Sequence, residues 1–178
     1  MRSRNTLFVT FYVLSITAAK AAPHKLPVID TSVNVFKWDI DKKDKGTLMF
    51  LDVQFSLRSK QYVTLTVAKT KTVKRPAFIS FILPGVIAPQ KGLKVSFTDD
   101  LKDPTRTVSA NMQFTESSGD TYTARAVDGY GNPGNKFDVF KDFTKYRYLI
   151  LLFYGKGDKQ KAVVVPLADF QTQYARLP

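Results

Sequence analysis

Short runs of alternating apolar and polar residues constrain this chain to a β-rich fold. Two neighbouring stretches have an apolar side chain at every second position: Leu51, Val53, Phe55 and Leu57 in the first, and Val63, Leu65 and Val67 in the second. Successive side chains of a β-strand point to opposite faces of its sheet, so a period of two is typical of a strand with one buried face. We therefore predict strands over 48–57 and 62–68.

Other short apolar runs, separated by turn residues, predict further strands. They cover residues 33–40, 78–83, 93–98, 107–115, 121–127, 146–154 and 162–166. The run 78–83 is almost wholly apolar, which indicates a central strand buried on both faces. Charged residues with a glycine at 41–46, and glycines with asparagines at 128–135, are typical of turns and loops.

Helical spacing is found only near the end of the chain. A short helix is expected near 136–144. A C-terminal helix is expected from an apolar stripe at intervals of three, four and three residues: Leu167, Phe170, Tyr174 and Leu177. The composition shows no linker after residue 32, so we predict a mainly β fold with one antiparallel β-sandwich domain over 33–178.

The first 21 residues have the three parts of a secretory signal peptide. Arg2 and Arg4 give a positive start, residues 7–18 form an apolar stretch, and small residues precede a cleavage point after Ala21. A membrane-spanning helix needs about 20 apolar residues, so this stretch is too short for the alternative, an uncleaved anchor. We expect export to the periplasm, outer envelope or medium, and an exposed lead-in over 22–32.

The chain is strongly basic. Its formal net charge of +12 falls to +9 when cleavage removes Arg2, Arg4 and Lys20. Such an excess favours anionic lipid head groups, acidic glycans, or an acidic envelope or host protein as partners. Export and the absence of a recognisable motif speak against nucleic acid. The alternative is that the charge serves solubility alone.

The densest basic group consists of Lys69, Lys71, Lys74 and Arg75. If the strand 62–68 continued, Lys69 and Lys71 would point toward its apolar side, so we expect this group to leave the sheet as a loop. It is the candidate site for an anionic ligand carrying phosphate or sulfate groups. The alternative is a solvated hairpin tip without a ligand.

The residues that commonly carry catalysis or bind metals are scarce. His24 is the only histidine and lies in the lead-in, and there is no cysteine, so no catalytic triad, thiol nucleophile or usual zinc site is expected. Asp99, Asp100 and Asp103 indicate a turn, with a cation or sugar site as the alternative. Tyr130, between two glycines, could face a ligand. We predict no enzyme, no metal and no cofactor.

Two stretches resemble a known family. FILPGVIAPQKGLKV at 81–95 and VVVPLADF at 163–170 are similar to the centre and the end of the invasion-associated locus B family of bacterial envelope proteins. The family commonly has cysteine pairs, which are absent here, and a glycine where this chain has Asp169. The resemblance implies an exported, non-catalytic envelope protein with a binding or structural role. A host-facing adhesion or colonisation factor for anionic glycans or lipids is the alternative.

Overall fold

The computed structural model describes residues 37–43, 46–56, 60–85, 87–103, 107–127, 130 and 138–177. The signal peptide and lead-in that the sequence predicts lie outside these residues, and so does His24. Most of the loop predicted at 128–135 also lies outside them.

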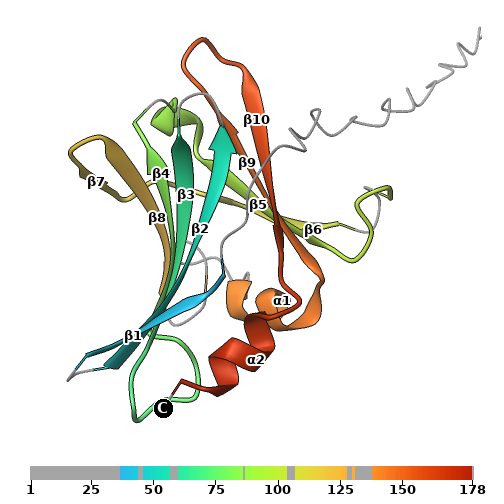
Figure 1. The fold of residues 1–178 in the computed structure, drawn as a ribbon. Helices are drawn as coiled ribbons and strands as arrows, with labels where there is room; N and C mark the ends of the chain where they lie inside the picture. Colours follow the sequence, from blue (N-terminus) through green and yellow to red (C-terminus); the bar gives the residue numbers. More distant parts are fainter. Residues whose placement is uncertain are drawn as a thin grey trace, which may run out of the picture.

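Two antiparallel sheets form a β-sandwich, which confirms the predicted fold class (Figure 1). The six-stranded sheet has the order β1 (Asp39–Lys43), β2 (Gly46–Ser56), β3 (Gln61–Lys69), β4 (Phe78–Pro84), β8 (Thr121–Val127) and β7 (Glu116–Ser118). The four-stranded sheet has the order β10 (Gln160–Pro166), β9 (Tyr148–Tyr154), β5 (Leu93–Thr98) and β6 (Val108–Met112). Every pairing within the two sheets is antiparallel.

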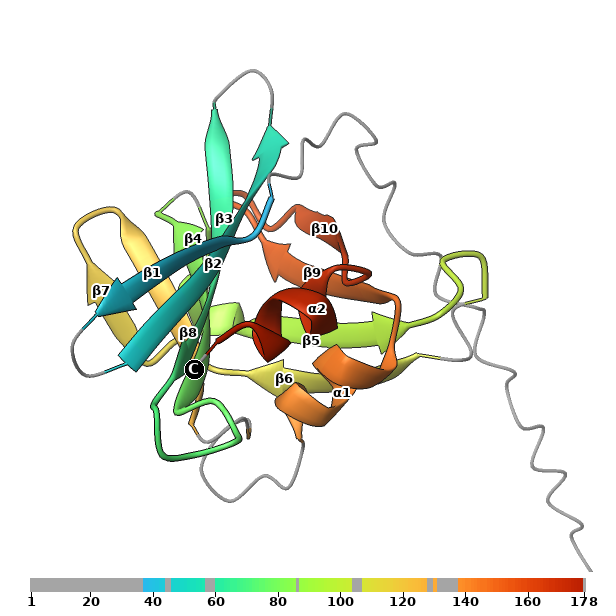
Figure 2. The same cartoon turned by 60° about the horizontal axis from the view of Figure 1, so that its bottom comes forward.

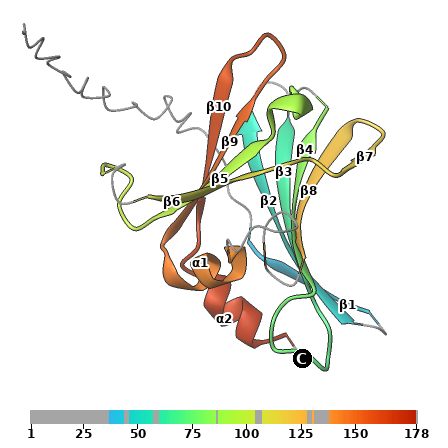
Figure 3. The same cartoon turned by 180° about the vertical axis from the view of Figure 1, so that it is seen from behind.

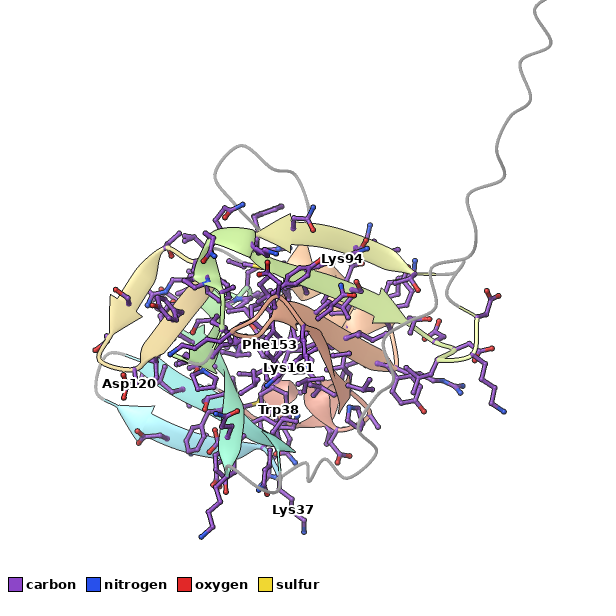
Figure 4. All side chains as sticks on the ribbon, turned by 90° about the horizontal axis from the view of Figure 1, so that it is seen from above. Lys37, Trp38, Lys94, Asp120, Phe153 and Lys161 are labelled. Atoms are coloured by element: carbon purple, nitrogen blue, oxygen red, sulfur yellow. The ribbon has the colours of Figure 1, made fainter. Side chains whose placement is uncertain are left out.

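The alternating residues of the sequence face the space between the sheets. Leu51 and Val53 of β2 are buried, and so are Val63, Leu65 and Val67 of β3. The apolar strand β4 is central, because it pairs with β3 on one side and β8 on the other. Seen from above, Phe153 lies among the strands while Lys94 and Asp120 lie on the outside (Figure 4).

Two helices close one end of the sandwich. They are α1 (Val139–Lys145) and α2 (Phe170–Ala175), which lie together below the sheets, while the 3-10 turn η1 (Pro89–Lys91) precedes β5 (Figures 1 and 2). The ring of Phe143 in α1 lies 5.4 Å from that of Phe97 and 4.9 Å from that of Phe170. Aromatic contacts therefore join the helices to the sheet core. The predicted C-terminal helix is confirmed, but it is shorter than its apolar stripe: Leu167, Phe170 and Leu177 are buried and Tyr174 is partly buried, while Leu167 and Leu177 lie outside the helix.

The structure corrects two boundaries and adds one strand. The turn predicted at 41–46 is shorter, because β1 continues through Lys43 as a charged edge strand paired with β2. The strand predicted to reach residue 115 ends at Met112, where the chain crosses from one sheet to the other. The strand β7 was missed because its three residues are polar and exposed, and so carry no apolar pattern.

Candidate anionic-ligand site

The loop between β3 and β4, residues 70–77, lies at the same end of the molecule as α2 (Figures 1 and 2). As predicted, Lys71, Lys74 and Arg75 leave the sheet in this loop. The prediction is wrong for Lys69, which is the last residue of β3. Lys69 lies on the same side of the strand as the buried residue Val67. The strand can include it because the C-terminal segment provides partners for its ammonium group.

That segment binds Lys69 in two ways. The ammonium group donates a 3.0 Å hydrogen bond to the backbone carbonyl of Leu177. It also lies 5.2 Å from the ring centroid of Tyr174, a cation–π contact. Lys69 therefore fastens the C-terminus to the sheet.

Arg75 is held by one acid and two aromatic rings. Its Nη2 lies 2.7 Å from Oδ1 of Asp138, and its guanidinium carbon lies 4.8 Å from the ring of Tyr130 and 5.3 Å from that of Phe140. The hydrogen bond to Asp138 raises the pKa of Arg75. The Tyr130 ring, a candidate ligand contact in the sequence, here covers a cation of the same protein.

Asp138 also caps α1, since its Oδ1 accepts a 2.9 Å hydrogen bond from the backbone N–H of Lys141. Burial raises the pKa of Asp138, but the hydrogen bonds from Arg75 and Lys141 and the charges of both outweigh burial and lower it. One carboxylate therefore joins the loop to the first turn of α1, and it does so in its ionised form.

We expect Asp138→Asn to cost about 1–2 kcal/mol of folding free energy at neutral pH. Asparagine can still cap the helix but cannot pair with Arg75, whose side chain is 36% exposed, so solvent screening keeps the cost moderate. Because folding lowers the pKa of Asp138, the ion pair stabilises above the ordinary value of 3.8 and its contribution is lost as pH falls through the folded value. Urea unfolding of both proteins should show their difference shrinking in acid. A difference independent of pH would contradict this assignment.

The backbone of the loop is fixed as well. The hydroxyl of Tyr174 donates a 2.8 Å hydrogen bond to the carbonyl of Lys74, and Ala77 N–H donates to the carbonyl of Ala68 at 2.7 Å. Burial raises the pKa of Tyr174 to about 12, so its hydroxyl remains a donor at neutral pH. The loop is thus held in place by contacts with α2 and the adjoining strands.

The four predicted cations divide into two pairs. Lys69 and Arg75 are engaged with the protein, whereas Lys71 and Lys74 are exposed. Within the described part of the chain, neither of these two ammonium groups has a hydrogen-bond or ion-pair partner. Of these four cations, Lys71 and Lys74 are therefore the two that an anion can contact without breaking the contacts of Lys69 and Arg75 within the protein.

An apolar hollow of about 240 Å³ adjoins the loop on the outer side of the six-stranded sheet. It is lined by Gly46, Thr47, Leu48, Ala68, Lys69, Thr70, Ala77 and Phe78. Sequence reasoning missed it, because its apolar side chains come from three strands and sit at the outward positions of each. Gly46 is required here, since a Cβ would lie 2.7 Å from the carbonyl oxygen of Lys69.

The aspartates after β5 form a turn, as expected. Oδ1 of Asp100 accepts a hydrogen bond from Lys102 N–H at 2.8 Å, and Oδ1 of Asp99 accepts one from Arg147 N–H at 3.0 Å. Among the described residues, no three His, Cys, Asp or Glu side chains are grouped so that they could hold a metal ion. Trp38 packs edge-on against Phe170 at 5.5 Å, as a residue at the rim of the core.

The chain matches no protein-family model, no curated protein and no solved structure. Neither helix described here has the length and apolar character needed to cross a bilayer.

Proposed function

We propose that this chain is an exported bacterial envelope protein that works by binding, not by catalysis, and that the β3–β4 loop is its contact with an anionic ligand. The observation that carries the proposal is that two of the four predicted cations hold the loop in place and the other two are exposed. Lys69 and Arg75 hold it in place, while Lys71 and Lys74 project without partners among the described residues. A loop held in this way presents two positive charges at little further entropic cost on binding.

Two features of the sequence support the remaining parts of the proposal. The signal-peptide pattern of residues 1–21 supports export, and the resemblance of 81–95 and 163–170 to the invasion-associated locus B family supports an envelope location. A non-catalytic role is favoured because Asp100 accepts a hydrogen bond within its own turn and Asp99 accepts one from the backbone N–H of Arg147.

The proposal is tested by binding at different salt concentrations. The purified protein should bind anionic lipid vesicles or a sulfated glycan in low salt, and the affinity should fall steeply as salt rises. Exposed charges are screened beyond about 8 Å at physiological ionic strength. Neutral vesicles and an uncharged glycan are the controls. Failure to bind either anionic probe in low salt would remove the hypothesis.

A further inference from the structure

We infer that the anionic ligand is the surface of a lipid bilayer, with Val73 entering its interfacial layer; this inference rests on the proposed function. Val73 lies in the loop between Lys71 and Lys74, and its side chain is 52% exposed. A β-branched apolar side chain that is half exposed gains little from the core. With the exposed lysines Lys71 and Lys74 on either side, it has the mixed apolar and basic character of a segment that binds at a membrane interface.

Two other exposed residues near the β3–β4 loop also favour a bilayer as the ligand. Val127 is 57% exposed and Tyr130 is 41% exposed. Val127 pairs with Phe78, the first residue of β4 after the loop, and it also bridges to Tyr130. Figures 1 and 3 show the loop and this end of β8 at the same end of the molecule. Three of the five most exposed large hydrophobic residues that the structure describes are thus near the basic loop.

Apolar side chains also line the outer face of the sheet beside the loop, where Ala68 is 8% exposed and the Arg125 guanidinium lies 4.6 Å from the ring of Phe78. Leu48, Ala68, Phe78 and Val127 follow one another across β2, β3, β4 and β8 in register. Their inward neighbours in the same strands, such as Met49 and Ile79, are fully buried in the core. The outward row borders the 240 Å³ hollow beside the loop. The site is therefore amphipathic, with apolar side chains next to two exposed lysines.

This combination distinguishes a bilayer from a soluble polyanion. A sulfated glycan offers charges to Lys71 and Lys74 but no apolar phase for Val73. A bilayer with anionic lipids offers both, because lysine side chains can extend to the head groups while a neighbouring apolar residue enters the acyl boundary. The exposed lysines beside an exposed valine therefore favour the bilayer over the glycan.

The test compares Val73→Ser with Val108→Ser. Val108 begins β6 in the other sheet and is 38% exposed, so it is a matched surface valine away from the loop. On vesicles of phosphatidylcholine and phosphatidylglycerol, Val73→Ser should weaken binding roughly fivefold, from the lost burial of its apolar surface, while Val108→Ser should not. Binding of either variant to a sulfated glycan should equal that of the unaltered protein.

A spectroscopic readout makes the insertion visible. In a Trp38→Phe background, Val73→Trp provides the only tryptophan, and its emission should shift to the blue when the anionic vesicles are added. Val108→Trp in the same background should show no shift.

The outcomes separate the two proposals. If reversing the charges of Lys71 and Lys74 abolishes vesicle binding but Val73→Ser binds normally and Val73→Trp shows no shift, the bilayer inference is overturned and the anionic site stands. Tighter binding to the sulfated glycan than to the vesicles also overturns it. If the charge reversal leaves binding intact, the proposed function itself fails.

Discussion

Phe81→Ala is expected to lose about 3–5 kcal/mol of unfolding free energy, the cost of a large cavity in a close-packed core. Phe81 lies in the central strand β4, has no exposed surface, and pairs with Leu65 of β3 and Ala124 of β8. Its ring centroid is 6.3 Å from that of Phe143, so the truncation also removes a contact between the sheet and α1. Urea unfolding followed by circular dichroism measures the loss.

Two comparisons make this result specific. Val127→Ala in the neighbouring strand β8 should change the unfolding free energy by less than about 0.5 kcal/mol, because Val127 is 57% exposed. Ile150→Ala in β9 should cost about 2–5 kcal/mol, since Ile150 is also fully buried. Losses below roughly 1 kcal/mol at both Phe81 and Ile150 would show that β4 and β9 are peripheral to the stability of the fold.

The fold class could be predicted because its main signals are local. The alternation in 48–57 and 62–68 and the apolar run 78–83 follow from the geometry of one strand and its burial, and these strands have the expected places in the sheet. The strands β1 and β7 carry charged or polar residues at an edge. Each of these segments forms a strand because it pairs with a neighbouring strand, and its own sequence has no apolar alternation that would predict a strand.

The candidate site could be predicted only in part, because its organisation depends on long-range contacts. The density of cations between residues 69 and 75 identifies the loop from the sequence. The partners of Lys69 and Arg75 are Leu177 and Asp138, which lie 108 and 63 residues further along the chain. No local pattern reveals which cations these partners bind and which they leave exposed. The apolar hollow is hidden from the sequence for the same reason.

Reversing Lys71 and Lys74 to Glu is expected to weaken binding to anionic vesicles by at least about thirtyfold. Each lysine near an anionic membrane contributes about 1 kcal/mol, so losing two costs about 2 kcal/mol, and the new carboxylates add repulsion. Both side chains are exposed, so the thermal stability of the variant should equal that of the unaltered protein. Vesicle co-sedimentation at low salt measures the loss, which should diminish as salt screens the charges.

The matched control reverses Lys156 and Lys159, which are exposed in the β9–β10 hairpin at the other end of the molecule (Figures 1 and 3). Each Lys→Glu change alters the charge by two units, so both double variants lower the net charge by four. A diffuse field from the whole protein would respond equally to the two, whereas a local site responds to its own charges. We therefore expect the hairpin variant to bind within a few-fold of the unaltered protein. Equal losses from the two variants would show that only the general positive charge matters, and the β3–β4 loop would then have no special role.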